Sequence, residues 1–287
     1  MEKDILLTIL TYGKNDGYQG GFANTMELYL NKLLDNIDKL SSSSIEVICV
    51  DWGSPPSEKL SDVINTPPNP FLKFIYVSEE IAAKYSPNFG FSLPHALNCG
   101  VRQSKGKYVL INDADVYTPY DSFLKTYNLV ESKNGEDLWY WGSRYHLPST
   151  IHLNASSTKE IDDAIEKWQK NGKKGWTFHK INSKGGTFSG GAGSLLISKS
   201  RFEECTGWYE VLTKWGWMDA EFHHRYGQKN SYLGDLWDLG ISVFHLNHHN
   251  FDSRSMKERN PTLRAPQYRA NGDNWGLGEE NIEIYKL

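Results

Sequence analysis

The stretch YVLINDAD, residues 108–115, decides the fold class of this chain of 287 residues. Its first four residues are apolar without alternation, which indicates a strand buried on both faces, as in a parallel sheet. Two aspartates, Asp113 and Asp115, follow where the strand ends. Ligands of open α/β sheets bind beyond the carboxyl ends of the strands. The stretch therefore predicts a parallel strand that delivers two carboxylates to a binding site.

Segments of the same kind precede this strand. Apolar runs at residues 5–10, 45–50 and 71–77 predict three further strands. Helices are expected at about residues 25–40, where apolar residues form one broad stripe, and at about 93–103. Strands that alternate with helices at this spacing predict an α/β fold with a mainly parallel, mixed sheet flanked by helices.

The second half of the chain is less regular. A helix is expected at about 159–170 and a strand at 194–198, after a glycine-rich stretch at 185–193. Residues from about 145 to 185 match no motif, and the chain becomes polar after residue 250. Neither a repeat nor a linker divides the sequence, which favours one large domain with a C-terminal extension.

The composition excludes several classes of function. Lys and Arg number 31 and Asp and Glu 35, a formal charge of −4, so we expect no nucleic-acid partner. The three cysteines (Cys49, Cys99 and Cys205) are widely spaced, and we expect reduced, buried thiols. No apolar run approaches the ~18 residues that span a bilayer, and no signal peptide is recognisable. We therefore expect a cytoplasmic protein that meets a membrane only peripherally.

Polar side chains stand at the ends of three predicted strands: Thr11, Asp51 and Asp113. Two carboxylates spaced as Asp113 and Asp115 can share a divalent cation and a ribose hydroxyl. A cation held by few protein oxygens keeps open positions for a substrate diphosphate. The alternative is that this triplet is only a polar turn after a strand.

Histidines concentrate late in the chain, with five of the nine between residues 223 and 249. His245 and His248 directly follow an apolar run. A neutral imidazole is a good ligand for manganese-like metals and would complete a site begun by Asp115. The spacing does not say which of the two binds, and a structural role for either stays open.

The stretch WGWMDAEF, residues 215–222, places two acids beside two tryptophans. Tryptophans suit a platform for a sugar ring, and an adjacent acid can accept a proton from an attacking hydroxyl. The alternative is the start of a helix with two acids in its first turn, favoured by the helix dipole. Both interpretations can hold together.

Four basic residues lie in the polar segment beyond residue 250: Arg254, Lys257, Arg259 and Arg264. They would offset the charge of a diphosphate if the segment closes over it. For any one of them, a solvated basic surface is the alternative.

Four motifs in order resemble family 2 glycosyltransferases. Asp51-Trp52-Gly53-Ser54 resembles their Asp-Asp-Gly-Ser turn, in which the first Asp meets the nucleobase. Residues 88–90, 96–101 and 106–109 resemble the segments before the Asp-x-Asp motif of that family. Residues 188–192 (Phe-Ser-Gly-Gly-Ala) and residues 215–225 resemble the region of β-1,4-galactosyltransferases and chondroitin polymerase that reads Trp-Gly-Gly-Glu-Asp-x-Glu-Phe-x-x-Arg.

The resemblance covers about residues 5–250 and implies a GT-A fold. It implies a metal-dependent, inverting glycosyltransferase that moves a sugar from a nucleotide diphosphate donor, by resemblance a UDP-sugar, to a glycan or other hydroxyl acceptor. The cofactor would be Mn²⁺ or Mg²⁺, and the pathway polysaccharide or glycoconjugate biosynthesis. The catalytic domain would span residues 1–250, with a nucleotide-binding half at about 1–115 and an acceptor- and metal-binding half at about 116–250. Residues 251–287 would pack on or close over the donor site.

The resemblance also implies a role for each site residue. Asp219 takes the position of the catalytic base. The nucleotide would be bound by Thr11, Tyr12, Asp51, Asn88, Asp113 and Ala114, and the metal by Asp115 with His245 or His248. The donor and acceptor sugars would meet Gly190, Gly191, Trp215, Trp217 and Glu221, and the diphosphate Arg254, Lys257 and Arg259.

Two departures from the family pattern affect the acceptor site. Trp217 replaces a Gly, and Met218 replaces the Glu that the family uses near the acceptor, so we expect the acceptor to be held differently. These departures leave open a degenerate transferase that serves as a carbohydrate-binding module. A sugar nucleotidyltransferase is a weaker alternative, because the loop at residues 13–21 contains Lys14 but no arginine.

Overall fold

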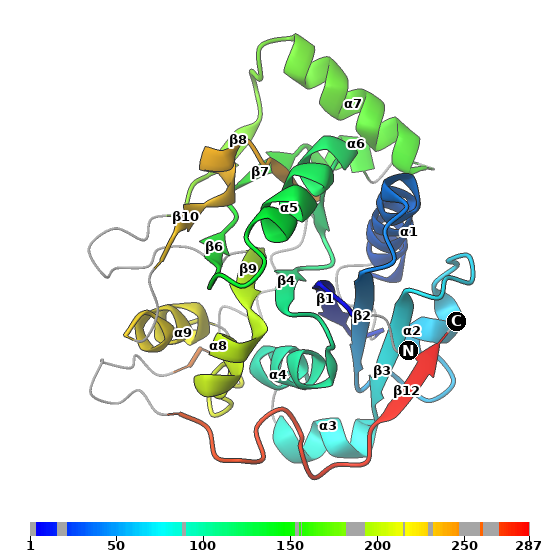
Figure 1. Cartoon of the computed structure of the whole chain (residues 1–287). Helices are drawn as coiled ribbons and strands as arrows, with labels where there is room; N and C mark the ends of the chain where they lie inside the picture. Colours follow the sequence, from blue (N-terminus) through cyan, green and yellow to red (C-terminus); the bar gives the residue numbers. More distant parts are fainter. Residues whose placement is uncertain are drawn as a thin grey trace.

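The computed structural model describes residues 4–15, 22–87, 90–152, 155, 157–181, 193–214, 216–228, 232–246, 259–260 and 270–286. Eight strands of this part form the main sheet, in the order β10-β6-β9-β4-β1-β2-β3-β12 (Figure 1). In chain order the strands are β1 (Leu7–Gly13), β2 (Ile45–Trp52), β3 (Leu72–Val77), β4 (Tyr108–Asn112), β6 (Trp139–Trp141), β9 (Ser194–Ser198), β10 (Gly234–Asp235) and β12 (Glu283–Lys286).

The centre of this sheet is parallel. Strand β1 lies between β2 and β4, and β3 pairs with β2, all in parallel. Strand β9 runs antiparallel to β4 and β6, and β12 runs antiparallel to β3. The expected α/β class with a mainly parallel, mixed sheet is thus confirmed. Residues of β2, β4 and β9 are buried throughout, as their largely apolar sequences predict.

Helices cover both faces of the main sheet (Figure 1). They are α1 (Phe22–Leu40), α2 (Leu60–Val63), α3 (Glu79–Tyr85), α4 (Leu93–Gln103), α5 (Tyr120–Ser132), α6 (Ser149–His152), α7 (Thr158–Lys170), α8 (Lys199–Glu204) and α9 (Met218–Gly227). Residues of α1 and α5 share one apolar core with one face of strands β1 to β4. Residues of α3, α4, α8 and α9 share a second core with the other face. The helices expected near 25–40, 93–103 and 159–170 are confirmed as α1, α4 and α7.

A smaller sheet lies beside the main one, in the order β5-β11-β7-β8. Its strands are β5 (Val116–Tyr117), β7 (Arg144–Leu147), β8 (Thr177–His179) and β11 (Val243–Leu246). One face of it packs against the apolar side of α7, through Ile161, Ile165 and Trp168, to form a third core. The buried ammonium of Lys32 on α1 lies 2.6 Å from the Asp162 carboxylate and attaches α7 to the rest of the chain.

The C-terminal segment 270–286 packs on the side of α4 and ends as an edge strand. The Arg102 guanidinium of α4 donates to the Trp275 carbonyl at 2.6 Å and stacks on the Trp275 ring. Strand β12 then pairs with β3 at the edge of the main sheet. The expected closure of residues 251–287 over the donor site stays a prediction for residues 251–258 and 261–269, which lie outside the described part.

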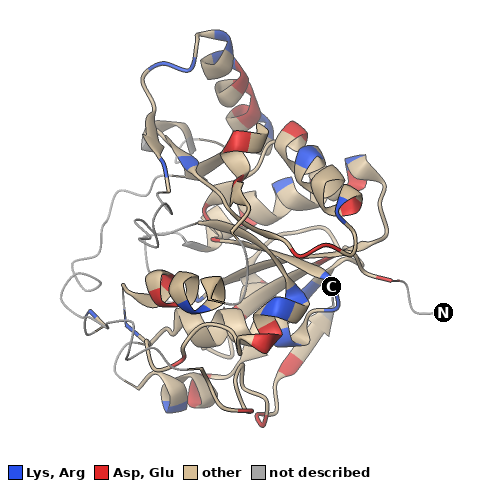
Figure 2. Ribbon diagram, turned by 60° about the vertical axis from the view of Figure 1, so that its left-hand side comes forward, with Lys and Arg blue, Asp and Glu red and all other residues tan. Residues whose placement is uncertain are grey.

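The surface of the described chain is mixed in charge. Figure 2 shows acidic and basic residues intermixed along α7, the uppermost helix, and over the other surface helices. Within the same residues, no helix is both long enough and apolar enough to cross a membrane. The three cysteines are free and buried, as expected.

Candidate functional site

Four parallel strands direct their carboxyl ends to one edge of the main sheet, and the candidate site lies where β4 ends. The Asp113 backbone amide donates to the Gly193 carbonyl at 2.9 Å, and the Val116 amide donates to the Asp113 carbonyl at 3.0 Å. A Cβ atom built on Gly193 would lie 2.6 Å from a Val116 methyl carbon, so only glycine allows this approach. These contacts fix the Asp113–Asp115 turn between the two sheets.

Each oxygen of the Asp113 carboxylate faces a polar group of another strand. The Tyr12 hydroxyl, from the end of β1, donates to Oδ1. The Arg144 guanidinium, from the start of β7, lies 3.7 Å from Oδ2. Burial and the neighbouring Asp115 charge raise the pKa of Asp113 above its ordinary value, and Arg144 opposes the rise. The side chain keeps 33% of its surface exposed, so it remains available to a ligand.

Asp219 lies close enough to Asp113 to interact with it electrostatically, although it stands 106 positions after Asp113 in the sequence. It stands in the first turn of α9. Burial, followed by the negative charge of Asp113, raises the pKa of Asp219 to about 7, whereas Arg144 and the Trp208 indole lower it. A partly exposed carboxyl with a pKa near neutrality is suited to accept a proton at physiological pH.

The backbone directly before Asp219 takes an unusual conformation. Gly216 and Trp217 both have positive φ, 84° and 68°. The left-handed conformation costs a residue with a Cβ, such as Trp217, roughly 1–2 kcal/mol. Residues held in this conformation cluster at functional sites. The Trp217 side chain is 40% exposed beside the start of α9, as a sugar platform would require.

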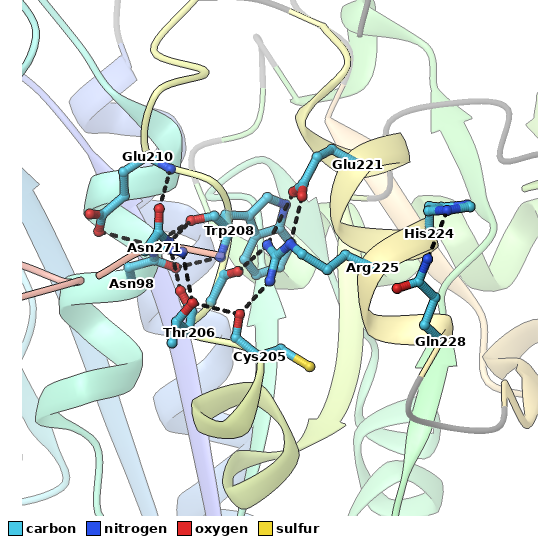
Figure 3. Close-up of polar contacts among 11 residues, drawn as sticks. Asn98, Cys205, Thr206, Trp208, Glu210, Glu221, His224, Arg225, Gln228 and Asn271 are labelled. Atoms are coloured by element: carbon cyan, nitrogen blue, oxygen red, sulfur yellow. Dashed lines mark hydrogen bonds and ion pairs between the residues drawn. The ribbon is translucent and has the colours of Figure 1, made fainter. Parts of the chain in front are cut away.

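A network of polar contacts holds α9 and the loop before it (Figure 3). The Arg225 guanidinium lies 2.6 Å from the Glu221 carboxylate, and it also donates to the carbonyls of Cys205 and Gly207. The Glu221 side chain is fully buried in this pair. Asp219 and Glu221 are two positions apart, roughly 200° around a helix, so they lie on different sides of α9. The contacts of Glu221 support α9, and its expected contact with a sugar stays a prediction.

Two further anchors fix the loop that leads to α9. The Asn98 amide on α4 donates to the Trp208 carbonyl at 2.8 Å, and the Trp208 amide donates back to Asn98 at 2.8 Å. The Trp208 ring then stacks on Phe222 of α9, with centroids 4.0 Å apart. Asn260, itself buried, donates to the Lys214 and Gly216 carbonyls. The position of Asp219 is therefore set by several segments distant in sequence.

Asp115 and His245 lie side by side because β5 and β11 pair. His245 stands opposite Val116 in this pair, and the Leu246 amide donates to the Asp115 carbonyl at 2.7 Å. The His245 Nε2 and Asp115 Oδ2 atoms are 3.2 Å apart. That spacing suits two ligand atoms on one cation, whose bonds are about 2.0–2.2 Å. The described residues contain no group of three His, Cys, Asp or Glu side chains that could hold a metal ion. A carboxylate oxygen and an imidazole nitrogen are both common metal ligands, so the pair fits part of a divalent-cation site.

Two residues that sequence reasoning missed join this cluster: Arg144 and His146. Both lie on β7, and His146 Nδ1 is 3.2 Å from His245 Nδ1; His179 lies on the next strand, β8, opposite Arg144. Burial, with smaller effects from His245 and Arg144, lowers the pKa of His146 to about 4, so this imidazole is neutral. The alternation of polar and apolar residues in RYHL, residues 144–147, is a strand signal that would have indicated this polar face.

The other nucleotide-site candidates lie in or beside the strand ends. Asp51 is 1% exposed; Ser54 donates to its Oδ1 and the Leu60 amide to its Oδ2 at 2.7 Å. Thr11 is fully buried, and its hydroxyl has no hydrogen-bond partner among the described residues. Ala114 packs in the first core.

The remaining candidates are not brought into this cluster by the described contacts. Arg259 is exposed. Seven candidates lie outside the described residues: Asn88, Gly190, Gly191, Trp215, His248, Arg254 and Lys257. Their roles stay predictions.

Comparison with known proteins gives structural matches only. No protein-family model matches the chain, and no curated protein matches it. A structure of S. aureus TarS, residues 1–349, is 14% identical with a TM-score of 0.45; the match covers 77% of this chain and 55% of that one. The catalytic domain of Drosophila β1,4-galactosyltransferase 7, in complex with xylobiose, is 11% identical with a TM-score of 0.42 and covers 96% of this chain and 84% of that one.

Proposed function

We propose that this protein is a glycosyltransferase that uses a divalent cation to move a sugar from a nucleotide diphosphate donor to a hydroxyl of an acceptor. The observation that carries the proposal is the convergence of Asp219 with Asp113 and Arg144 at the carboxyl end of β4. Asp113 and Asp219 belong to the motifs that resemble family 2 glycosyltransferases, whereas Arg144 comes from the small sheet. Acid, base and cation-binding groups within one cluster are what such a transfer requires.

Asp115 and His245 would hold the Mn²⁺ or Mg²⁺ ion, because their facing atoms lie 3.2 Å apart. When bound, the cation stabilises the negative charge that develops on the leaving diphosphate. Arg144 lies beside Asp113 and adds a fixed positive charge to the same region. Asp113, with its partly exposed carboxylate, would accept a hydrogen bond from the ribose of the nucleotide.

Asp219 would act as the general base. Its pKa of about 7 lets the carboxylate take a proton from the acceptor hydroxyl as that oxygen attacks the anomeric carbon. Attack from the face opposite the leaving group inverts the configuration. Exposed Trp217 stands two residues before the base and offers a flat apolar face on which the acceptor sugar can stack.

The experiment that tests the donor site is calorimetric titration with UDP, with and without Mn²⁺. We expect binding that depends on Mn²⁺ in the wild type and is abolished in Asp115→Ala. GDP would be titrated in parallel. Absence of binding to either nucleotide, with or without the metal, would contradict the proposal and favour a carbohydrate-binding module.

The catalytic step is tested by release of UDP from a panel of UDP-sugars. Asp219→Asn should bind UDP and Mn²⁺ as the wild type does but lower the transfer rate by roughly 10²–10⁴-fold, the usual contribution of a positioned base. Full transfer activity in Asp219→Asn would remove Asp219 from the base position and leave the donor site intact.

A further inference from the structure

The small sheet has two unlike faces. On β7, Tyr145 and Leu147 belong to the core that packs against α7. Side chains alternate along a strand, so Arg144 and His146 project from the opposite face. Arg144 lies against Asp113, and His146 lies against His245. The strand therefore presents its polar residues to the same cluster that holds the proposed site.

His245 is contacted on both nitrogens of its ring. Its Nε2 faces the Asp115 carboxylate at 3.2 Å, and its Nδ1 faces His146 Nδ1 at 3.2 Å. The two imidazoles meet edge to face, with ring centroids 4.9 Å apart. Strand pairing fixes this contact, because His245 stands opposite His146 in the β11–β7 ladder.

The chemistry of imidazole gives this contact a direction. A neutral ring carries one proton, so Nε2 can offer a lone pair to a cation only when Nδ1 holds the proton. The Nδ1–H group then needs an acceptor. Histidines that bind metals almost always donate this second N–H to a neighbouring group, which fixes both the tautomer and the orientation of the ring.

We propose that His146 is a positioning residue that accepts a hydrogen bond from His245 Nδ1–H and thereby holds His245 Nε2 towards the cation shared with Asp115. The inference rests on the proposed function in that it requires His245 to bind a cation. His146 does not touch the cation or the sugar. Its effect is on the affinity for the metal and on the tautomer of one ring.

The test compares two nearly isosteric variants. His146→Asn keeps an oxygen acceptor close to the position of Nδ1, whereas His146→Leu removes it. His179→Leu is the matched control: it removes a histidine from the neighbouring strand whose ring centroid lies 6.2 Å from that of His146. Mn²⁺ dissociation constants, measured by electron paramagnetic resonance with UDP present, should rise about 10–100-fold in His146→Leu. They should change less than about threefold in His146→Asn and His179→Leu.

A second measurement reads the tautomer directly. Two-bond ¹⁵N–¹H spectra of the Mg²⁺-loaded protein should show His245 protonated on Nδ1 in the wild type and in His146→Asn. In His146→Leu this preference should be lost, while the circular dichroism spectrum is unchanged.

The outcomes separate the two proposals. A wild type that binds neither Mn²⁺ nor Mg²⁺ would overturn the proposed metal site and this inference with it. A wild type that binds Mn²⁺, together with a His146→Leu variant of equal affinity and unchanged His245 tautomer, would overturn the role of His146 alone. A His146→Asn variant as weak as His146→Leu would also count against it.

Discussion

At the scale of single residues, the environment of Asp219 decides what this carboxyl can do. An aspartate in water is ionised well below neutral pH. Here burial and the Asp113 charge oppose ionisation and raise the pKa to about 7, while Arg144 and Trp208 limit the rise. A base with this pKa is half ionised at neutral pH and still strong enough to take a proton.

A pH dependence follows from this raised pKa. Below pH 7 Asp219 is mostly protonated and cannot accept a proton, so kcat/KM for the acceptor should fall about tenfold per pH unit and level off above pH 7. The profile is measured at saturating Mn²⁺ and donor. A rate that stays constant from pH 5.5 to 8.5 would contradict the assignment.

At the scale of elements, α9 depends on one buried arginine. Arg225 lies 2.6 Å from Glu221, which is fully buried, and donates 2.5 Å to the Gly207 carbonyl. Removing one partner of such a pair leaves an uncompensated buried charge, whereas removing both restores neutrality. The start of α9, which carries Asp219, should therefore be sensitive to this pair.

Arg225→Met should lower the free energy of unfolding by about 3–5 kcal/mol, as breaking a buried ion pair does. The double variant Arg225→Met/Glu221→Met should be less destabilised than the single one. Arg201→Met is the matched control: its pairs with Asp137 and Glu204 are exposed, so its loss should cost less than about 1 kcal/mol. Urea unfolding measures all three. Equal stabilities of Arg225→Met and Arg201→Met would contradict the argument.

At the scale of the whole molecule, the sequence predicted most of what local pattern determines. Mainly apolar runs indicated the central strands, and apolar stripes indicated α1 and α7. The Asp113–Asp115 turn was predicted because it directly follows β4. Local pattern could not predict the approach of Asp219 to Asp113, since it depends on how α9 packs against the second core. It also could not predict the contact between His146 and His245, because only the pairing of β7 with β11 brings these two residues together.

The separate core of the small sheet leads to a last prediction. Phe244 on β11 is fully buried between α7 and the small sheet and is adjacent to His245, whereas Phe123 on α5 is buried in the first core. Truncating either to Ala should cost about 3–5 kcal/mol of stability. Because β11 positions His245 against Asp115, Phe244→Ala should also weaken Mn²⁺ binding, measured at a temperature where both variants remain folded. Phe123→Ala should leave the Mn²⁺ affinity within about twofold of the wild type, since a core change far from the site leaves the ligand atoms in place. If both variants lose the same metal affinity, the two cores act as one cooperative unit, and β11 positions the proposed ligand no more than the rest of the fold does.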